Sequence, residues 1–422
     1  MIGGPLTLTV HRAAHEIGGN CIELALGDHR ILLDAGSPLD AAEAPASEQI
    51  PKSLDIDTNI DGVVISHPHQ DHYGLLAGLP PSWPVWAGGP SEALMRLTAS
   101  LTGGSIRQPV HRFDSFVPFS IGPFRITPLL TDHSAFDAHM LLIEAGGRRV
   151  LYSGDFRRTG RKAVLVDRVM ANPPRDVDVL LLEGTTLGRT TAFPTERELE
   201  DRFLALFNEA KGRVFITWSA QNIDRTVSIY RASRRAGRTL FLDAYSLDVL
   251  DQLSAFRDSL PRLGLPGIHG VITKSMARLY GSSGRVGRPE FVERIVKTGR
   301  CIGAARLASE SRAVIMLRPS LMRDFQHKGL QLRSDDAWVF SQWSGYLSRG
   351  GYPEIKRAFT QAGAAFHQIH TSGHAHYDDL LALAARVNAK ALVPIHSFDW
   401  DSHAGAFPRV LRLRDGERHV VA

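Results

Sequence analysis

The sequence has 422 residues, of which 43% are hydrophobic and 22% charged. These values exclude a disordered chain and indicate a soluble globular protein with two or three domain-sized units. No apolar run approaches the about 20 residues that span a bilayer, and the N-terminus lacks the pattern of a secretory signal, so no membrane partner is expected. The two cysteines, Cys21 and Cys301, provide neither a disulfide framework nor a thiolate zinc site, and we expect a cytoplasmic protein.

The net charge of +5 is unevenly distributed. Residues 201–350 contain 24 Lys and Arg against 13 Asp and Glu, a net charge of +11, so the rest of the chain is acidic. A basic middle segment of this kind favours an anionic polymer as partner. An Arg-rich surface that is only solvated is equally consistent with the charge alone.

Residues 5–35 predict two or three short strands, the last of which, ILLD, ends at Asp34. A carboxylate at this position is placed to orient an imidazole ligand of a metal ion. The alternative is an Asp that only forms the turn before Ala35 and Gly36.

The stretch DGVVISHPHQDHYGLLAGL, residues 61–79, combines a short buried strand, four candidate ligands and the start of a helix. His67 and His69, two apart on an extended chain, point the same way and can bind one ion. Asp71 and His72, where the chain turns, can face a second ion. Burying four such groups costs several kcal/mol unless they are paired or coordinated. A metal site is therefore favoured over a chance cluster of surface residues.

Four later apolar strands also end at candidate ligands or acid–base groups. Between His133 and Asp155 the sequence predicts a hairpin of two strands around Gly146 and Gly147. The four residues are His133, Asp155, Glu183 and His396. Because the pattern recurs, we expect these strand ends to share one rim.

From residue 195 strands and helices alternate, which predicts a separate unit with a parallel sheet. We expect an N-terminal domain part at 1–195, an inserted domain at 196–350 and a C-terminal domain part at 351–422. In the last part, His370 and His374 flank Ser372 and Gly373 before a helix.

The candidate ligands comprise only imidazoles and carboxylates, and there are too many for one tetrahedral zinc. They are His67, His69, Asp71, His72, His133, Asp155 and His396. They fit two ions that share a carboxylate, which are typically about 3.5–4 Å apart and lower the pKa of a water between them towards about 7. Such a centre is expected to perform hydrolysis. His374 beside Glu183 suits a general acid that protonates a leaving oxygen.

The motif HPHQDH resembles the HxHxDH signature of the metallo-β-lactamase superfamily. Asp34, TDHS with His133 and SGDF with Asp155 fall where its other motifs would. Glu183, HTSGHA and VPIHS resemble the three further motifs of the β-CASP nucleases, most of all those of RNase J-type ribonucleases.

This resemblance implies an α/β fold, namely a metallo-β-lactamase αββα sandwich with an inserted β-CASP α/β domain. His67, His69 and His133 would then hold the first of two Zn²⁺ ions, with Mn²⁺ as the alternative metal. Asp71, His72 and His396 would hold the second, and Asp155 would bridge them. The catalytic candidates are Asp71, His374 and Glu183, and Asp34 would support the ligands.

The resemblance also implies a path for a single nucleic-acid strand. Ser372 and Gly373 would hold a phosphate, whereas His370 has either this role or a structural one. Arg318, Ser320 and Arg323 are weaker phosphate candidates. Bases would stack on aromatic residues such as Trp218, Tyr245 or Trp343, although each also suits a hydrophobic core.

We therefore expect a zinc-dependent ribonuclease acting on single-stranded RNA, as a 5′→3′ exonuclease, an endonuclease or both. A DNA nuclease is the nearest alternative, followed by a small-molecule hydrolase and a metal-depleted RNA-binding scaffold. The chain ends 26 residues after His396, where RNase J enzymes usually continue into a dimerisation domain. That mode of assembly is not expected, while a homodimer stays open.

Overall fold

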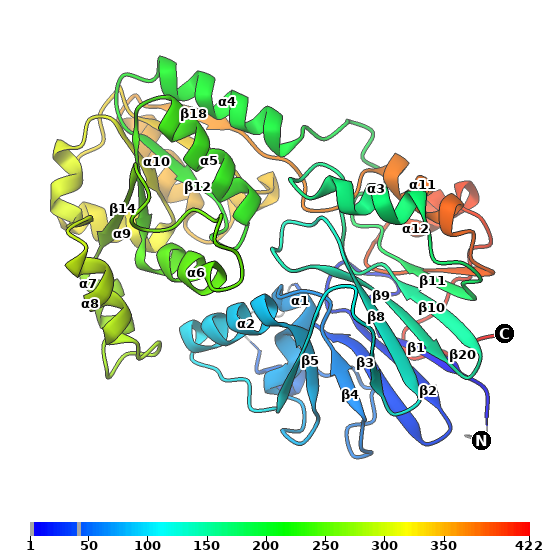
Figure 1. Ribbon diagram of the computed structural model, residues 1–422. Helices are drawn as coiled ribbons and strands as arrows, with labels where there is room; N and C mark the ends of the chain where they lie inside the picture. The colour runs from blue at the N-terminus through cyan, green and yellow to red at the C-terminus, as the bar shows by residue number, and fades with distance from the viewer. Residues whose placement is uncertain (1–3, 40–43) are drawn as a thin grey trace. The chain divides into compact units, whose positions relative to one another are not determined.

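The computed structural model describes residues 4–39 and 44–422, which form two compact units. The first unit comprises Met1–Ala99, Gly104–Phe193 and Gly373–Ala422, and the second comprises Ser100–Gly103 and Pro194–Ser372. Figure 1 shows the elements of both units, which are described separately here. None of the helices in the described ranges is sufficiently long and apolar to cross a membrane.

The first unit contains two β-sheets. The seven-stranded sheet has the order β20 (Arg418–Val420), β1 (Thr7–Arg12), β2 (Cys21–Leu26), β3 (His29–Ala35), β4 (Gly62–Val64), β5 (Val85–Gly88) and β6 (Val110–Phe113). The six-stranded sheet has the order β19 (Ala391–Pro394), β11 (Val179–Leu182), β10 (Arg148–Tyr152), β9 (His139–Ala145), β8 (Phe124–Leu130) and β7 (Phe119–Ile121). The predicted hairpin is formed by β9 and β10, whose turn residues Gly146 and Gly147 have φ angles of 57° and 73°.

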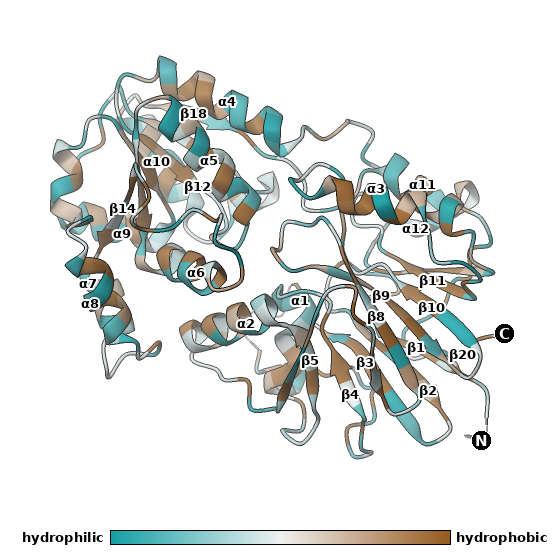
Figure 2. Ribbon diagram, in the orientation of Figure 1, coloured by the Kyte–Doolittle hydropathy of each residue, from teal (hydrophilic) through white to brown (hydrophobic). Residues whose placement is uncertain are grey.

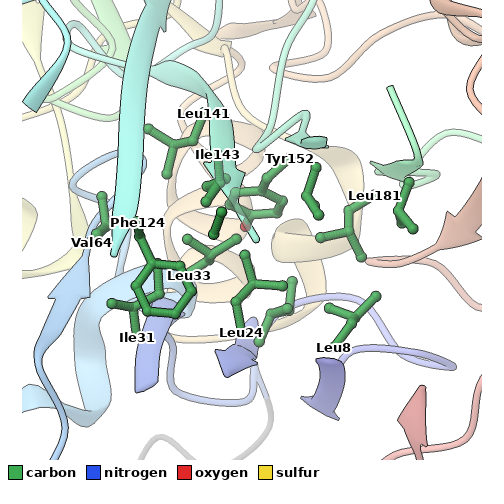
Figure 3. Close-up of a cluster of buried hydrophobic side chains, with 14 of the residues drawn as sticks. Leu8, Leu24, Ile31, Leu33, Val64, Phe124, Leu141, Ile143, Tyr152 and Leu181 are labelled. Atoms are coloured by element: carbon green, nitrogen blue, oxygen red, sulfur yellow. The ribbon is translucent and has the colours of Figure 1, made fainter. Parts of the chain in front are cut away.

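One hydrophobic core lies between these sheets and contains residues from both (Figure 3). Side chains alternate along a strand, so Ile31 and Leu33 of β3 face this core while Leu32 packs into a second cluster on the other side. That second cluster includes Met95 of α2 (Gly89–Thr102). A third cluster packs α3 (Ala163–Ala171) and α11 (Tyr377–Val387) on the outer side of the six-stranded sheet. The order of layers is the αββα sandwich predicted from the sequence.

Short helices complete the first unit. They are η1 (Ala46–Gln49), α1 (Gln70–Tyr73), η2 (Gly74–Ala77), α12 (Trp400–His403) and η5 (Ala404–Ala406). The second half of the HPHQDH motif thus lies in one α-helical turn, which is followed by a 3₁₀ turn.

The second unit is built on one parallel sheet. Its order is β15 (Cys301–Gly303), β14 (Ile268–Ile272), β13 (Thr239–Asp243), β16 (Ala313–Met316), β12 (Val214–Thr217), β17 (Ala337–Phe340) and β18 (Ala365–Gln368). The helices are α4 (Glu196–Glu209), α5 (Ile223–Arg235), α6 (Ala244–Ser254), α7 (Lys274–Tyr280), α8 (Pro289–Lys297), η3 (Ala304–Ser309), α9 (Pro319–His327), η4 (Ser344–Ser348) and α10 (Tyr352–Gln361). In Figure 2 the central strands are mainly apolar, whereas α4 and α5 also carry polar residues, as expected for amphipathic helices.

Residues 351–372 belong to the second unit and not to the C-terminal part of the sandwich, where the sequence had placed them. The reason is strand pairing: β18 adds to the parallel sheet beside β17, with Ala365 opposite Ala337. Helix α10 contributes Ile355 and Phe359 to the core of the same unit.

Candidate metal centre

The candidate ligands of the first unit meet because they follow strands that end at one edge. Strands β10, β11 and β19 are parallel neighbours, and β8 runs in the same direction because β9 is antiparallel to both β8 and β10. His133, Asp155, Glu183 and His396 follow β8, β10, β11 and β19, respectively. The HPHQDH motif follows β4 of the facing sheet.

Three imidazoles form the first ligand group. His69 Nδ1 lies 3.2 Å from His67 Nε2 and 3.2 Å from His133 Nε2. Two nitrogens bound to one tetrahedral zinc at about 2.0–2.1 Å are about 3.3 Å apart. The spacing of these nitrogens therefore fits a shared ion.

The second group comprises Asp71, His72, Asp155 and His396, with one possible ligand atom from each within 4.8 Å of the others. His72 Nε2 is 3.2 Å from Asp155 Oδ2, and His396 Nε2 is 3.5 Å from Asp71 Oδ2. The Nε2 atoms of His72 and His396 are buried without a hydrogen-bond partner in the part of the chain that the structure describes. Buried polar atoms of this kind are normally satisfied, so their lone pairs fit a metal ion.

Asp155 connects the two groups. Its Oδ2 lies 3.7 Å from His67 Nε2 of the first group and 3.2 Å from His72 Nε2 of the second. Burial alone would raise the pKa of this carboxyl group, but His396, His72 and His374 outweigh burial and hold the pKa well below its usual value. Asp155 is therefore an anion with imidazoles of both groups around it, as a bridging ligand requires.

Asp34 sits behind the second group, fully buried and with a left-handed φ of 61°. Its Oδ2 accepts hydrogen bonds from the Ser66 hydroxyl at 2.7 Å, the Tyr152 hydroxyl at 2.5 Å and His72 Nδ1 at 2.7 Å. The bond to Nδ1 leaves the Nε2 lone pair of His72 available for a metal, which is the usual role of such a carboxylate.

Glu183 and His374 form a pair at the same edge. His374 Nδ1 lies 3.0 Å from Glu183 Oε2, and Glu183 Oε1 accepts the backbone N–H of Phe156 at 2.9 Å. Burial disfavours the protonated form of His374, but Glu183 and Asp155 outweigh this effect and raise its pKa. Both residues also lie within 4.8 Å of ligand atoms of Asp155 and His396, so the pair borders the second group.

The residues at this centre that were not predicted from the sequence include Thr185 and Tyr152. Thr185 Oγ1 donates to Glu183 Oε2 at 2.8 Å, and the Tyr152 hydroxyl donates to Asp34. Thr185 follows Glu183 by two residues, but hydroxyl groups are common in loops. No spacing rule would have selected either residue.

The predicted substrate contacts are divided between the units. Gly373 belongs to the first unit, where a Cβ would lie 2.7 Å from Ser134 Oγ and 3.4 Å from His133 Cε1. Glycine thus permits the close approach of this backbone to a ligand side chain. The others, His370, Ser372, Arg318 and Ser320, belong to the second unit, and their roles stay predictions. Arg318 already forms an ion pair of 3.0 Å with the buried Asp243.

Comparisons with known proteins identify relatives over most of the chain. The family description "Metallo-beta-lactamase superfamily" matches residues 16–203, and "Zn-dependent metallo-hydrolase RNA specificity domain" matches residues 363–399. Ribonuclease J of Sinorhizobium meliloti is 24% identical over 95% of this chain and 72% of that protein. Ribonuclease J of Mycoplasma genitalium is 22% identical over 93% of this chain and 68% of that protein. For the Helicobacter pylori B128 enzyme the identity is 23%, over 90% of this chain and 54% of that protein.

A crystal structure of a protein of unknown function from Enterococcus faecalis V583 has the same fold, with a TM-score of 0.78 and 17% identity over 99% of this chain and 100% of that chain. Residues 16–203 contain the HPHQDH motif, His133, Asp155 and Glu183, and residues 363–399 contain His374 and His396. Residues 16–203 thus carry a domain of the metallo-β-lactamase superfamily, and residues 363–399 match the RNA specificity domain of zinc-dependent metallo-hydrolases.

Proposed function

We propose that this protein is a zinc-dependent ribonuclease of the β-CASP family that hydrolyses phosphodiester bonds in single-stranded RNA. The observation that carries the proposal is the presence of the Glu183–His374 pair beside two ligand groups that share Asp155. The matched RNA specificity domain and the relatives named Ribonuclease J support RNA as the substrate.

In this proposal the first unit holds two ions. His67, His69 and His133 would hold one, Asp71, His72 and His396 would hold the other, and Asp155 would be shared by the two groups. Two zinc ions would lower the pKa of a water molecule and neutralise charge on the phosphoryl oxygens. The Asp71 side chain is 18% exposed, and its carboxylate would orient the water that attacks phosphorus.

His374 would protonate the leaving oxygen. Glu183 accepts the hydrogen bond from Nδ1, so Nε2 is the atom that would donate the proton. Glu183 and Asp155 raise the pKa of His374 and so favour the protonated imidazole, which a general acid requires before each turnover. The carboxylate also keeps the imidazole in one tautomer and orientation.

The other functions make different demands on the molecule. A single-stranded DNA nuclease would use the same centre and is the second candidate. A lactone or thioester hydrolase would need neither the Glu183–His374 pair nor a basic second unit. A scaffold without metals would leave the buried Nε2 atoms of His72 and His396 with no hydrogen-bond partner among the residues that the structure describes.

Hydrolysis of matched oligonucleotides tests the proposal. Single-stranded RNA and DNA of one sequence, each with a 5′-monophosphate or a 5′-hydroxyl group, are incubated with the zinc-loaded protein. We expect cleavage of RNA in preference to DNA, and mononucleotide products would indicate a 5′→3′ exonuclease whereas a ladder would indicate an endonuclease. Equal cleavage of DNA, or intact RNA, would refute the assignment.

A further inference from the structure

The second unit exposes a pair of aromatic rings directly after strand β17. Trp343 and Tyr346 are each 42% exposed, and their ring centroids are 5.4 Å apart with an angle of 86° between the planes. Both rings belong to the turn around η4, at the edge where β17 ends. Large aromatic side chains gain free energy by leaving water, so an exposed pair suggests a bound partner.

Gly345 allows the indole ring of Trp343 to lie against the backbone. A Cβ atom at this glycine would lie 2.3–2.6 Å from three carbons of the Trp343 ring, so any other residue would displace the ring. The indole therefore rests directly on the backbone. A fixed ring loses little conformational entropy when a ligand binds, which favours a recognition role.

The two other aromatic residues considered from the sequence are less accessible. Trp218 is only 3% exposed and donates its Nε1 hydrogen to Thr226. Tyr245 is half-buried, with the guanidinium group of Arg318 5.3 Å from its ring centroid. Trp343 is thus the one of the three that presents a large ring to solvent.

The position and charge of the pair favour a nucleic-acid strand. In open parallel sheets, ligands bind outside the carboxyl ends of the strands, where the strand order changes direction. From β12 the chain continues to β13 on one side of the sheet, beyond β16, whereas β17 pairs with the other side of β12. The strand order therefore changes direction around β12, and the turn with Trp343 and Tyr346 follows the neighbouring strand β17. Residues 342–353 include Arg349 and no acidic residue, and Glu354 follows them, so the turn that carries the rings is itself positively charged.

We propose that Trp343 and Tyr346 form a stacking site for a base of single-stranded nucleic acid on the second unit. The site rests on the proposed function, because it takes the same strand that the metal centre hydrolyses. Aromatic stacking is tolerant of sequence, since every base presents a π face. The site would add affinity independently of the phosphate contacts.

Binding by the full-length, zinc-loaded protein tests this site. A fluorescent single-stranded 2′-O-methyl phosphorothioate oligoribonucleotide is used because it resists hydrolysis, and its integrity is checked after each titration. We expect Trp343→Ala to weaken binding about tenfold and Trp343→Phe to retain most of the affinity. The slope of affinity against salt concentration should not change, because no phosphate contact is lost.

Phe256→Ala is the matched control. Phe256 is 41% exposed and follows the C-terminal end of α6, whose N-terminus lies at the carboxyl end of β13. Phe256 therefore lies near the amino ends of the strands, whereas Trp343 follows a carboxyl end. Removal of the Phe256 ring should leave binding unchanged. An oligonucleotide without bases should bind the wild type and Trp343→Ala equally.

Three results would overturn the stacking site. They are equal affinity of the wild type and Trp343→Ala, an equal loss in Phe256→Ala, and a wild-type dimer that Trp343→Ala converts to a monomer in light scattering. The last would identify the rings as a contact between copies of the chain. The nuclease proposal fails separately: Trp343-dependent binding without RNA cleavage would retain the stacking site and reject the ribonuclease.

Discussion

His72 donates its Nδ1 hydrogen to Asp34 Oδ2 over 2.7 Å, and both side chains are fully buried. This bond defines the tautomer of His72 and directs the Nε2 atom towards Asp155, 3.2 Å away. Asp34 has an αL backbone conformation, which a short polar residue adopts more readily than most. The backbone at the end of β3 and the carboxylate of Asp34 together orient His72 in the second ligand group.

Asp34→Asn should weaken zinc binding without abolishing folding. The amide has the same size but lacks the charge that supports the imidazole, and loss of such a partner typically costs about 10–100-fold in metal affinity. The measurement is competition with a chelator, read as zinc per chain. Asp61→Asn is the control, because Asp61 pairs with His29 at 3.3 Å and is part-exposed. Equal zinc affinity in both variants would contradict the role of Asp34.

Removal of the metal should lower thermal stability. Without ions, several ligand atoms are buried with no hydrogen-bond partner among the described residues, including both oxygens of Asp155. Saturation at 100 times Kd stabilises a folded protein by about 2.7 kcal/mol, which corresponds to roughly 5–10 °C for a domain of this size. Calorimetry before and after chelation should show this loss, and added zinc should reverse it.

Two ligand variants sharpen the stability test. In His67→Ala the chelator effect should be much smaller, because one ligand group is broken before chelation. His111→Ala changes an exposed histidine of β6 that packs on Trp86 and should respond to the chelator as the wild type does. A melting temperature insensitive to chelation in the wild type would argue that the ligand groups bind no metal.

Loss of the imidazole at position 374 should separate catalysis from metal binding. If His374 protonates the leaving group, His374→Ala should retain its zinc but lower kcat by at least about 100-fold. Zinc content and kcat are measured on one preparation. Full activity would exclude His374 from the mechanism, and loss of zinc would identify it as a ligand, as its place beside Asp155 and His396 also permits.

The pH dependence should follow from the Glu183–His374 contact. Glu183 raises the pKa of His374 against the effect of burial, so the protonated form persists to higher pH. In Glu183→Gln this support is lost and the pKa of His374 falls. The alkaline limb of the kcat profile should therefore move to lower pH, while zinc content stays the same. An unchanged alkaline limb would show that another group controls it.

The αββα layers were predicted from the resemblance of the motifs, whereas the convergence of the candidate ligands was predicted from local signals. Each of His133, Asp155, Glu183 and His396 follows a run of apolar residues, and strand ends at one edge meet. The membership of residues 351–372 depended instead on long-range pairing of β18 with β17. No local pattern specifies which of two sheets a strand joins, so this boundary was wrong.

The accessibility of single side chains was also beyond the sequence. Trp218 and Trp343 both follow apolar strands, yet the first is buried and the second exposed. The difference arises from Thr226, which accepts the indole hydrogen of Trp218, and from Gly345, on which Trp343 rests. Arg318 was a weaker candidate for a phosphate contact; it pairs with Asp243 at the end of β13, and its role stays a prediction.

Thr185 supplies the last prediction. Its hydroxyl group donates to Glu183 Oε2 at 2.8 Å and also lies 3.2 Å from Nδ1 of His396. One hydroxyl group therefore contacts both the carboxylate that orients the proposed acid and a candidate ligand of the second ion. Thr185→Val keeps the shape but removes the hydroxyl group, so Glu183 loses a donor that helps to fix its orientation.

We expect Thr185→Val to lower kcat about tenfold, less than the about 100-fold or more that a general acid itself contributes, with an unchanged KM and zinc content. Thr185→Ser keeps the donor and should retain most of the activity. An equal loss in both variants would mean that the methyl group and its packing matter. A loss of zinc in Thr185→Val alone would place the essential contact at His396. Only a fall in kcat that serine rescues, with zinc retained, supports a hydroxyl group that acts through Glu183.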